Sequence, residues 1–362
     1  MIKIAEPVLD GNELRYVVDC IRRRQLSGAQ YVELFESAFA EWIGAKYAIA
    51  TTSGTTALHL ALVALGVHAG QEVIVPDLTF VATANAVLMC GATPIFCDVD
   101  LPTMVMDVQH VAELITERTV GIIPVHLYGN PVAMRQLLRI AGEHFLFVLE
   151  DAAEAPGTTY HGISVGTLGQ AACFSFYGNK LLTMGEGGAI TTNDAALADK
   201  LRRLRGQGVD PQRRYWHTEL GYNYRLSELQ GAVGLAQVEA ADSLLARRKV
   251  VAKWYREEQG PWRWQQPTAE AQPAWWMNVA ILDENMPSRD SVIEKLARSN
   301  IESRPVFYPL HVLPAFQDFQ HTGDFANSET LSRRGIVLPS HNLLSPSDVH
   351  YICEEIRACG KF

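Results

Sequence analysis

The segment Phe145-Leu-Phe-Val-Leu-Glu-Asp151 is a run of apolar residues that ends on two carboxylates. Segments with helical spacing, such as 82–89 and 108–115, lie between this run and similar ones. Short, nearly continuous apolar strands that alternate with helices are typical of a mostly parallel central sheet covered by helices on both faces. The sequence therefore predicts an α/β fold with ligands at the carboxyl ends of the strands. The similar runs are Glu72-Val-Ile-Val-Pro76, Thr93-Pro-Ile-Phe-Cys-Asp98 and Val120-Gly-Ile-Ile-Pro-Val-His126.

The length and the change of pattern along the chain predict two domains. The 362 residues exceed one domain of ordinary size, and 48% of them are hydrophobic. Residues 227–259 are rich in Ala, Glu, Leu, Arg and Lys and favour one or two long helices, and a polar stretch, 261–273, follows. We expect a large domain at 1–240 and a smaller C-terminal α+β domain at 241–362.

The formal charge limits the possible partners. The chain has 31 Lys and Arg against 40 Asp and Glu, a net charge of −9. Such a chain repels phosphate backbones and anionic lipid, so neither nucleic acid nor a membrane is expected as partner. The uncharged stretches 47–70 and 78–97 are interrupted by Ser, Thr, Gly and Pro and indicate buried elements, not membrane spans. A small anionic substrate would need a local cluster of Arg or Lys.

The cysteines and the N-terminus predict a cytoplasmic protein. The six cysteines form no Cys-x-x-Cys pair, and most lie in apolar runs. We interpret them as reduced core residues, with neither disulfides nor a metal site. The first residues, Met1 to Glu6, lack the features of a signal peptide.

A Ser/Thr/Gly cluster, Thr51-Thr-Ser-Gly-Thr-Thr56, precedes a helix with a good apolar face. Free N–H groups and the positive end of the helix would make an anion site there. An ordinary helix N-cap would explain the same residues. The Gly-x4-Gly-Lys pattern of a P-loop is absent.

Two further residues lie where strands are expected to end. Asp151 closes its apolar strand, and an ionised carboxylate there would keep a pyridine nitrogen protonated, although a helix cap or a metal ligand is the alternative. Lys180 follows Phe174-Ser-Phe-Tyr-Gly-Asn, where burial would lower the pKa of its amine for Schiff-base chemistry. Each signal alone is weak. Together, a phosphate cradle, an Asp and a Lys in this order are the anchors of pyridoxal 5'-phosphate (PLP) in fold-type I enzymes.

With these anchors, the chain resembles the DegT/DnrJ/EryC1/StrS family of sugar aminotransferases along nearly its whole length. Two motifs favour the perosamine-forming branch of the family: Phe-Tyr-Gly-Asn-Lys and Arg213-Arg-Tyr-Trp-His. The other motifs that carry the resemblance are Ser53-Gly-Thr-Thr-Ala-Leu, Pro124-Val-His-Leu-Tyr-Gly, Glu150-Asp-Ala-Ala-Glu-Ala, Gly185-Glu-Gly-Gly188, Gly221-Tyr-Asn-Tyr-Arg-Leu-Ser and Arg304-Pro-Val-Phe-Tyr-Pro-Leu-His. The residues at 102–107, 208–214 and 275–277 differ from the family's usual sequence, which leaves the identity of the sugar open.

The resemblance implies a role for each residue that would hold the cofactor. Lys180 would be the Schiff-base lysine and the proton shuttle, and Asp151 would pair with the pyridine nitrogen. Gly54 and Thr55 would bind the phosphate through their N–H groups, with help from the Ser175 hydroxyl.

Three more residues complete the cofactor site that the resemblance implies. Phe80 would stack on the cofactor ring, and Glu154 would lie near the ring hydroxyl. Asn223 would reach the phosphate in the neighbouring subunit, so the protein would be a homodimer with shared active sites.

The resemblance also implies the reaction. L-Glutamate would convert PLP to pyridoxamine phosphate, which would then aminate C4 of a nucleotide-linked 4-keto-6-deoxy sugar. GDP-4-keto-6-deoxy-D-mannose, giving GDP-perosamine, is the favoured substrate. A dTDP-linked, UDP-linked or unlinked keto sugar and a non-catalytic PLP-binding regulator are the alternatives.

The substrate's diphosphate requires positive groups in this acidic chain. Arginines in and after the 208–214 segment, and polar residues of the small domain, are the candidates, although surface ion pairs and packing would also explain them. The substrate-binding candidates are Arg213, Arg214, Arg225, Arg304, Tyr308 and His311.

Overall fold

The computed structural model describes residues 1–28, 30–210, 212–317, 319 and 323–360. Within them, the largest sheet has seven strands in the order β1-β9-β8-β5-β4-β2-β3. Every pairing in it is parallel except the two made by β9. In spatial order the strands are Tyr47–Thr51, Gly188–Thr192, Ala171–Ser175, Phe147–Asp151, Thr119–Ile122, Glu72–Pro76 and Thr93–Cys97. The predicted α/β fold with a mostly parallel sheet is therefore confirmed.

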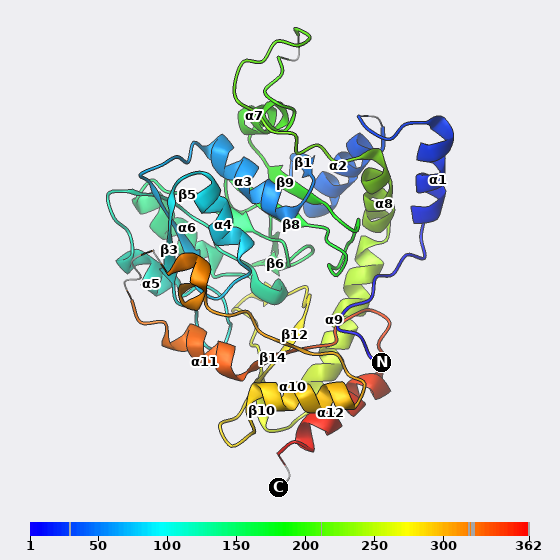
Figure 1. The fold of residues 1–362 in the computed structure, drawn as a ribbon, viewed down its shortest axis with the longest axis vertical. Helices are drawn as coiled ribbons and strands as arrows, with labels where there is room; N and C mark the ends of the chain where they lie inside the picture. The colour runs from blue at the N-terminus through cyan, green and yellow to red at the C-terminus, as the bar shows by residue number, and fades with distance from the viewer. Residues whose placement is uncertain (29, 211, 318, 320–322, 361–362) are drawn as a thin grey trace.

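Helices cover both faces of this sheet, because alternate strand residues point to opposite sides. Ile49 and Leu149 pack toward α3, α4 and α7 on one face. Ala48 and Phe174 pack toward α2 and α8 on the other, and Figure 1 shows these layers. The helices of this part are α1 (Glu13–Arg23), α2 (Gln30–Ile43), α3 (Gly54–Leu65), α4 (Ala82–Met89), α5 (Val108–Glu113), α6 (Met134–Glu143), α7 (Ala195–Arg205) and α8 (Glu228–Glu239), with the 3-10 turn η1 (Leu127–Gly129).

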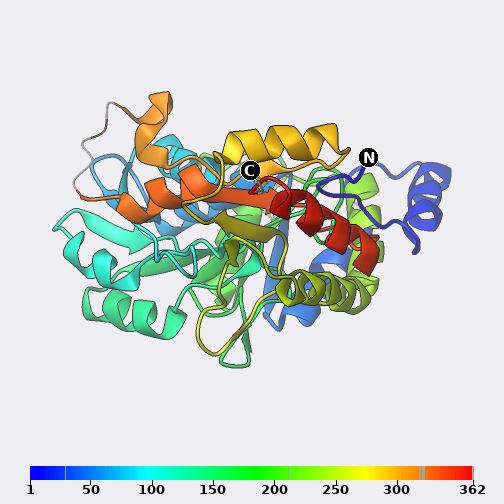
Figure 2. The ribbon, with the colours of Figure 1, turned by 90° about the horizontal axis from the view of Figure 1, so that it is seen from below.

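The C-terminal part is built on a second sheet in the order β10-β12-β14-β13. Figure 2 shows α9, α10 and α12 gathered around this sheet, and they share an apolar cluster with it that includes Tyr255 and Ile352. Its elements are α9 (Ala241–Glu257), β10 (Trp262–Trp264), β12 (Asn278–Leu282), α10 (Arg289–Arg298), β13 (Arg304–Pro305), η2 (Leu310–Val312), η3 (Pro314–Phe316), α11 (Ala326–Arg334), β14 (Gly335–Leu338) and α12 (Pro346–Arg357). A small third sheet joins β6 (Thr159–Tyr160), β7 (Ile163–Ser164) and β11 (Ala271–Gln272).

Some boundaries differ from the expectation. The strand expected from Phe145 begins at Phe147, because Phe145 is 96% exposed and has a φ of +56°. The stretch 261–273 contributes β10 to the small sheet. Residues 227–259 form two helices that meet at Ala240. The division of the chain near residue 240 stays a prediction.

The described residues contain no helix with both the length and the apolar character needed to cross a bilayer. All six cysteines are free, and five of them are buried. Because β5 and β8 are parallel neighbours, Asp151 and Ser175, their last residues, lie at the same edge of the large sheet. That edge holds the candidate site.

Candidate active site

The N-terminus of α3 forms one wall of the site. Ser53 caps the helix by accepting the Thr56 N–H in a capping box, and the N–H groups of Gly54 and Thr55 precede the first carbonyl partner inside the helix. A Cβ atom at position 54 would lie 2.9 Å from the Ser175 Cβ. Glycine therefore allows Ser175 to lie directly against the helix end, where N–H groups and a hydroxyl can bind an anion.

Asp151 is a buried carboxylate with fixed hydrogen bonds. Its Oδ2 accepts the Thr83 hydroxyl at 2.7 Å, and its Oδ1 accepts the Ala153 N–H at 3.2 Å. Burial raises the pKa of Asp151, while these two hydrogen bonds and the charge of Lys180 act in the opposite direction. The carboxylate is thus held in place for a positively charged partner.

Lys180 lies beyond β8, and its amine faces Glu154. The Lys180 Nζ is 3.6 Å from the Glu154 Oε1, with the two side chains 12% and 6% exposed. Burial lowers the pKa of Lys180, and the carboxylates of Glu154 and Asp151 oppose that shift. Burial likewise raises the pKa of Glu154. Both shifts favour the neutral forms, and a neutral amine is the nucleophile of Schiff-base chemistry.

Two aromatic residues complete the surroundings of Lys180. The Lys180 Nζ lies 3.9 Å from the centre of the Trp276 ring, and the Trp276 indole donates a hydrogen bond to the Asn179 carbonyl at 2.9 Å. Tyr128, which stacks beside Trp276, donates its backbone N–H to the Glu154 Oε2 at 2.7 Å. The lysine is therefore held between a carboxylate and an aromatic face.

These groups line one cavity of about 520 Å³, which is within the range of small-molecule sites. The predicted residues Gly54, Thr55, Phe80, Asp151, Glu154, Ser175, Lys180 and Arg304 all line it. Phe80 is 54% exposed and tilts against Phe307 with ring centres 5.8 Å apart. The cavity thus brings together the residues that a single subunit was expected to contribute to the cofactor site.

Asn223 lies outside this cavity, in an exposed segment between α7 and α8. Its Oδ1 accepts the Arg225 Nε at 3.0 Å. Tyr222 and Tyr224 flank it with stacked rings, and the Tyr224 hydroxyl lies 3.1 Å from the Nδ1 of buried His59 in α3. The segment is thus tied to α3 while Asn223 faces outward.

Most of the predicted substrate residues also lie away from the cavity lining. Arg213 packs over Trp216, and Arg214 over Tyr215, in the segment that projects beyond α7 in Figure 1. Arg304 lines the cavity and pairs with Glu302 at 2.8 Å. Whether these arginines meet a diphosphate stays a prediction.

The small-domain candidates have partners within the chain. Tyr308 is 51% exposed, and the Arg289 guanidinium lies 5.4 Å from the centre of its ring. His311 lies 2.8 Å from Asp77 through its Nδ1 and stacks on Phe325. Neither residue lines the cavity described above, and their role in nucleotide binding stays a prediction.

Sequence reasoning missed the role of Thr83 and misjudged Trp276. Thr83 ends the run Leu78-Thr-Phe-Val-Ala-Thr83, one helical turn after the expected ring-stacking residue Phe80, and that spacing is the signal that could have found it. Trp276 belongs to the stretch 275–277, which the sequence shows only as a departure from the family's usual residues, yet it contacts the catalytic candidate Lys180. Within the described residues, no group of three or more His, Cys, Asp or Glu is placed to hold a metal ion.

The residues present fit pyridoxal phosphate. A glycine-lined helix N-terminus with a hydroxyl suits its phosphate, a buried carboxylate suits its pyridine nitrogen, and a buried amine suits its aldehyde. On a mostly parallel sheet covered by helices, this arrangement defines a PLP-dependent transferase of fold type I.

Comparisons with known proteins give the family. The model of the DegT/DnrJ/EryC1/StrS aminotransferase family matches residues 7–357, and the chain belongs to this family. GDP-perosamine synthase of Caulobacter vibrioides is 47% identical over 96% of this chain and 95% of that protein. The enzyme of the same name from Escherichia coli O157:H7 is 43% identical over 98% of this chain and 97% of that protein.

Solved structures agree with the fold. PseC of Helicobacter pylori, an aminotransferase involved in pseudoaminic acid biosynthesis, has a TM-score of 0.94 at 27% identity and covers 99% of this chain and 98% of its own. DesI, solved in the presence of its TDP-sugar product, has a TM-score of 0.91 at 30% identity, covering 99% of this chain and 92% of its own. The expected fold and family are thus confirmed, and the chain is a PLP-dependent sugar aminotransferase.

Proposed function

We propose that this protein transfers the amino group of L-glutamate to C4 of GDP-4-keto-6-deoxy-D-mannose and so forms GDP-perosamine. The proposal of amino transfer rests on one observation: Lys180 and Asp151 lie at one sheet edge beside the N-terminus of α3. The choice of sugar rests on the two GDP-perosamine synthases, which match this chain over nearly the full length.

The residues of the site divide the chemistry among them. Bound pyridoxal phosphate supplies an aldehyde that accepts an amino group and a ring that withdraws electrons from the neighbouring carbon. Asp151 would hold a proton on the ring nitrogen through a carboxylate that Thr83 already orients. Lys180 would take a proton from the α-carbon of L-glutamate in one half-reaction and give a proton to C4 of the sugar in the other, so its Nζ must be neutral for part of the cycle.

The surroundings of Lys180 suit this transfer. Burial favours the neutral amine, while Glu154, 3.6 Å away, stabilises the protonated amine. These opposing influences allow the Nζ to gain and release a proton without a large cost in either direction. Trp276, against which Tyr128 stacks, covers the amine, and the Lys180 side chain is only 12% exposed, which limits the access of water.

We further propose a cytoplasmic homodimer in which Asn223 enters the partner's site. Asn223 is exposed and lies outside its own cavity, and exposed apolar residues precede it in the same segment, with Tyr215 77%, Trp216 50% and Leu220 83% exposed. A second subunit would cover such a patch. The free cysteines support a reducing compartment.

A substrate panel tests the proposal. GDP-, dTDP- and UDP-linked 4-keto-6-deoxy sugars are each supplied with L-glutamate, and 2-oxoglutarate and amino sugar are measured, with Lys180→Ala as the control. The GDP sugar should have a kcat/KM at least about tenfold above the others. Preference for a dTDP sugar, the kind of molecule in the DesI structure, would overturn the choice of sugar. PLP binding without turnover of any keto sugar would indicate a regulator.

A further inference from the structure

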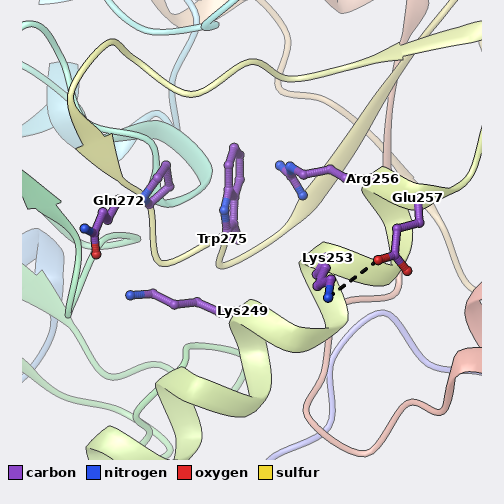
Figure 3. Close-up of a pocket in the computed structure, with 7 residues that line it drawn as sticks. Lys249, Lys253, Arg256, Glu257, Gln272 and Trp275 are labelled. Carbon is purple, nitrogen blue, oxygen red and sulfur yellow. Dashed lines mark ion pairs between the residues drawn. The ribbon is translucent and has the colours of Figure 1, made fainter.

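A second pocket lies on α9, outside the cavity that holds Lys180. It has a volume of about 400 Å³ and is lined by Lys249, Lys253, Arg256, Glu257, Gln272, Pro273 and Trp275. The three basic residues are spaced at i, i+4 and i+7 and so share one face of α9. Figure 3 shows them on this helix, with the Arg256 side chain directed toward the Trp275 ring.

Arg256 is a partly buried charge with neutral partners. Its guanidinium lies 3.4 Å from the centre of the Trp275 ring, and its Nη1 donates to the Ala252 carbonyl at 3.0 Å and the Asn278 Oδ1 at 3.1 Å. Burial lowers the pKa of Arg256 to about 10. No carboxylate in the described residues forms an ion pair with it, so its positive charge is balanced by neutral carbonyl oxygens and an aromatic ring alone.

The other two cations add to this charge. Burial lowers the pKa of Lys249, and no described residue forms an ion pair with its amine. Lys253 pairs with Glu257 at 3.7 Å, but both side chains are exposed, at 74% and 60%. A surface pair of this kind contributes little, so Lys253 can turn to another anion. With Glu257 counted, the pocket carries a net charge of +2 in a chain of net −9.

The arrangement favours a phosphate group over other anions. A phosphate group carries nearly two negative charges at neutral pH and has three acceptor oxygens pointing in different directions. Three cationic side chains line the pocket and can each donate to a different phosphate oxygen, whereas a carboxylate presents two oxygens in one plane and suits a single arginine. The size of the pocket suits a small molecule, and the acidic chain around it repels long polyanions.

We propose that the pocket formed by Lys249, Lys253, Arg256 and Trp275 binds the phosphate group of a small soluble molecule. This site is separate from the cofactor cavity, although the two approach each other closely. Trp275 contacts Arg256, while the next residue, Trp276, contacts Lys180. The proposal does not depend on which sugar the enzyme aminates.

Calorimetric titration of the PLP-loaded protein with inorganic pyrophosphate at low salt tests the site. Pyrophosphate should bind saturably, and Lys249→Gln and Arg256→Gln should each weaken it by at least about tenfold. Lys253→Gln should weaken it several-fold, and because Lys253 is exposed this variant leaves folding intact. Arg247→Gln is the matched control, since it removes a charge from an exposed position of α9 outside the pocket, and it should change affinity by less than about twofold.

The outcomes separate the site from its alternatives. An equal loss in Arg247→Gln would mean diffuse attraction to the helix, and a loss confined to Arg304→Gln would mean binding in the cofactor cavity; either result overturns the proposal. Absence of saturable binding, or equally tight binding of succinate, overturns it as well. A nucleoside diphosphate that binds more tightly than pyrophosphate and depends on Lys249 would identify a nucleotide ligand, and equal affinities would show that the site recognises the phosphate groups alone; both support the site.

Discussion

Replacing Glu154 with Gln should make Lys180 neutral at lower pH. The Glu154 Oε1 is 3.6 Å from the Lys180 Nζ, and for full charges at this distance Coulomb's law with an effective dielectric constant of about 20 gives about 4.6 kcal/mol. That attraction opposes the lowering of the Lys180 pKa by burial. Removing it lowers the pKa of Lys180 further. Glutamine can still accept the Tyr128 N–H, so the local fold is retained.

The assay is the rate at which apoprotein takes up pyridoxal phosphate covalently, followed by cofactor absorbance across pH. Only the neutral amine attacks an aldehyde, so the rise in rate should occur at lower pH in Glu154→Gln than in wild type. Below neutral pH, uptake should be at least about tenfold faster. The ionisations of the cofactor itself are common to both proteins and do not affect the comparison. Glu154→Asp, which keeps the charge, should behave like wild type, and superimposable wild-type and Glu154→Gln profiles would refute the electrostatic argument.

Three further predictions concern the proposed cofactor site. Lys180→Ala should abolish both covalent cofactor uptake and transamination, and retained turnover would show that another amine acts. Asp151→Asn should keep the fold, checked by circular dichroism, but lower kcat/KM by more than about tenfold, or about 1.4 kcal/mol of barrier, because an amide cannot stabilise the ring proton; a smaller loss argues against the pairing. Mixing Asn223→Ala with Lys180→Ala subunits should restore some activity, because one of the two sites in the heterodimer is then intact, and an inactive, proven heterodimer would mean that each site comes from one chain.

The residues whose positions the sequence predicted best are those near the ends of strands. Asp151 ends an apolar run, and the alternation of strand and helix is enough to place it at the carboxyl edge of a sheet. Ser175, which ends the neighbouring parallel strand, was implied only by the family resemblance. Gly54 and Thr55 follow from the cluster that caps α3, because a helix start needs such residues. These residues are positioned by their neighbours in the sequence, so a local sequence pattern is enough to predict where they lie.

The parts that the sequence left open depend on groups far apart in the chain. Thr83 meets Asp151 across 68 positions. Trp276 meets Lys180 because the segment that precedes β12 lies against Gly129, to whose carbonyl the Ala274 N–H donates. The arginines proposed for the diphosphate, such as Arg213 and Arg225, are exposed. In the proposed homodimer their use would depend on the second subunit, whose position no pattern within one chain specifies.

The two adjacent tryptophans show why residue type alone could not assign this segment. Trp275 adopts a φ of +52°, an uncommon backbone conformation for a bulky residue. Gly129 lies so close that a Cβ on it would be 2.8 Å from the Trp275 nitrogen and 2.9 Å from the Trp276 nitrogen. The segment is therefore pressed against the large domain, and its two rings reach different charged groups, Arg256 for Trp275 and Lys180 for Trp276. One peptide unit therefore joins the proposed phosphate pocket to the wall of the cofactor cavity, and a pattern of residue types along the chain does not show that these two neighbours belong to different sites.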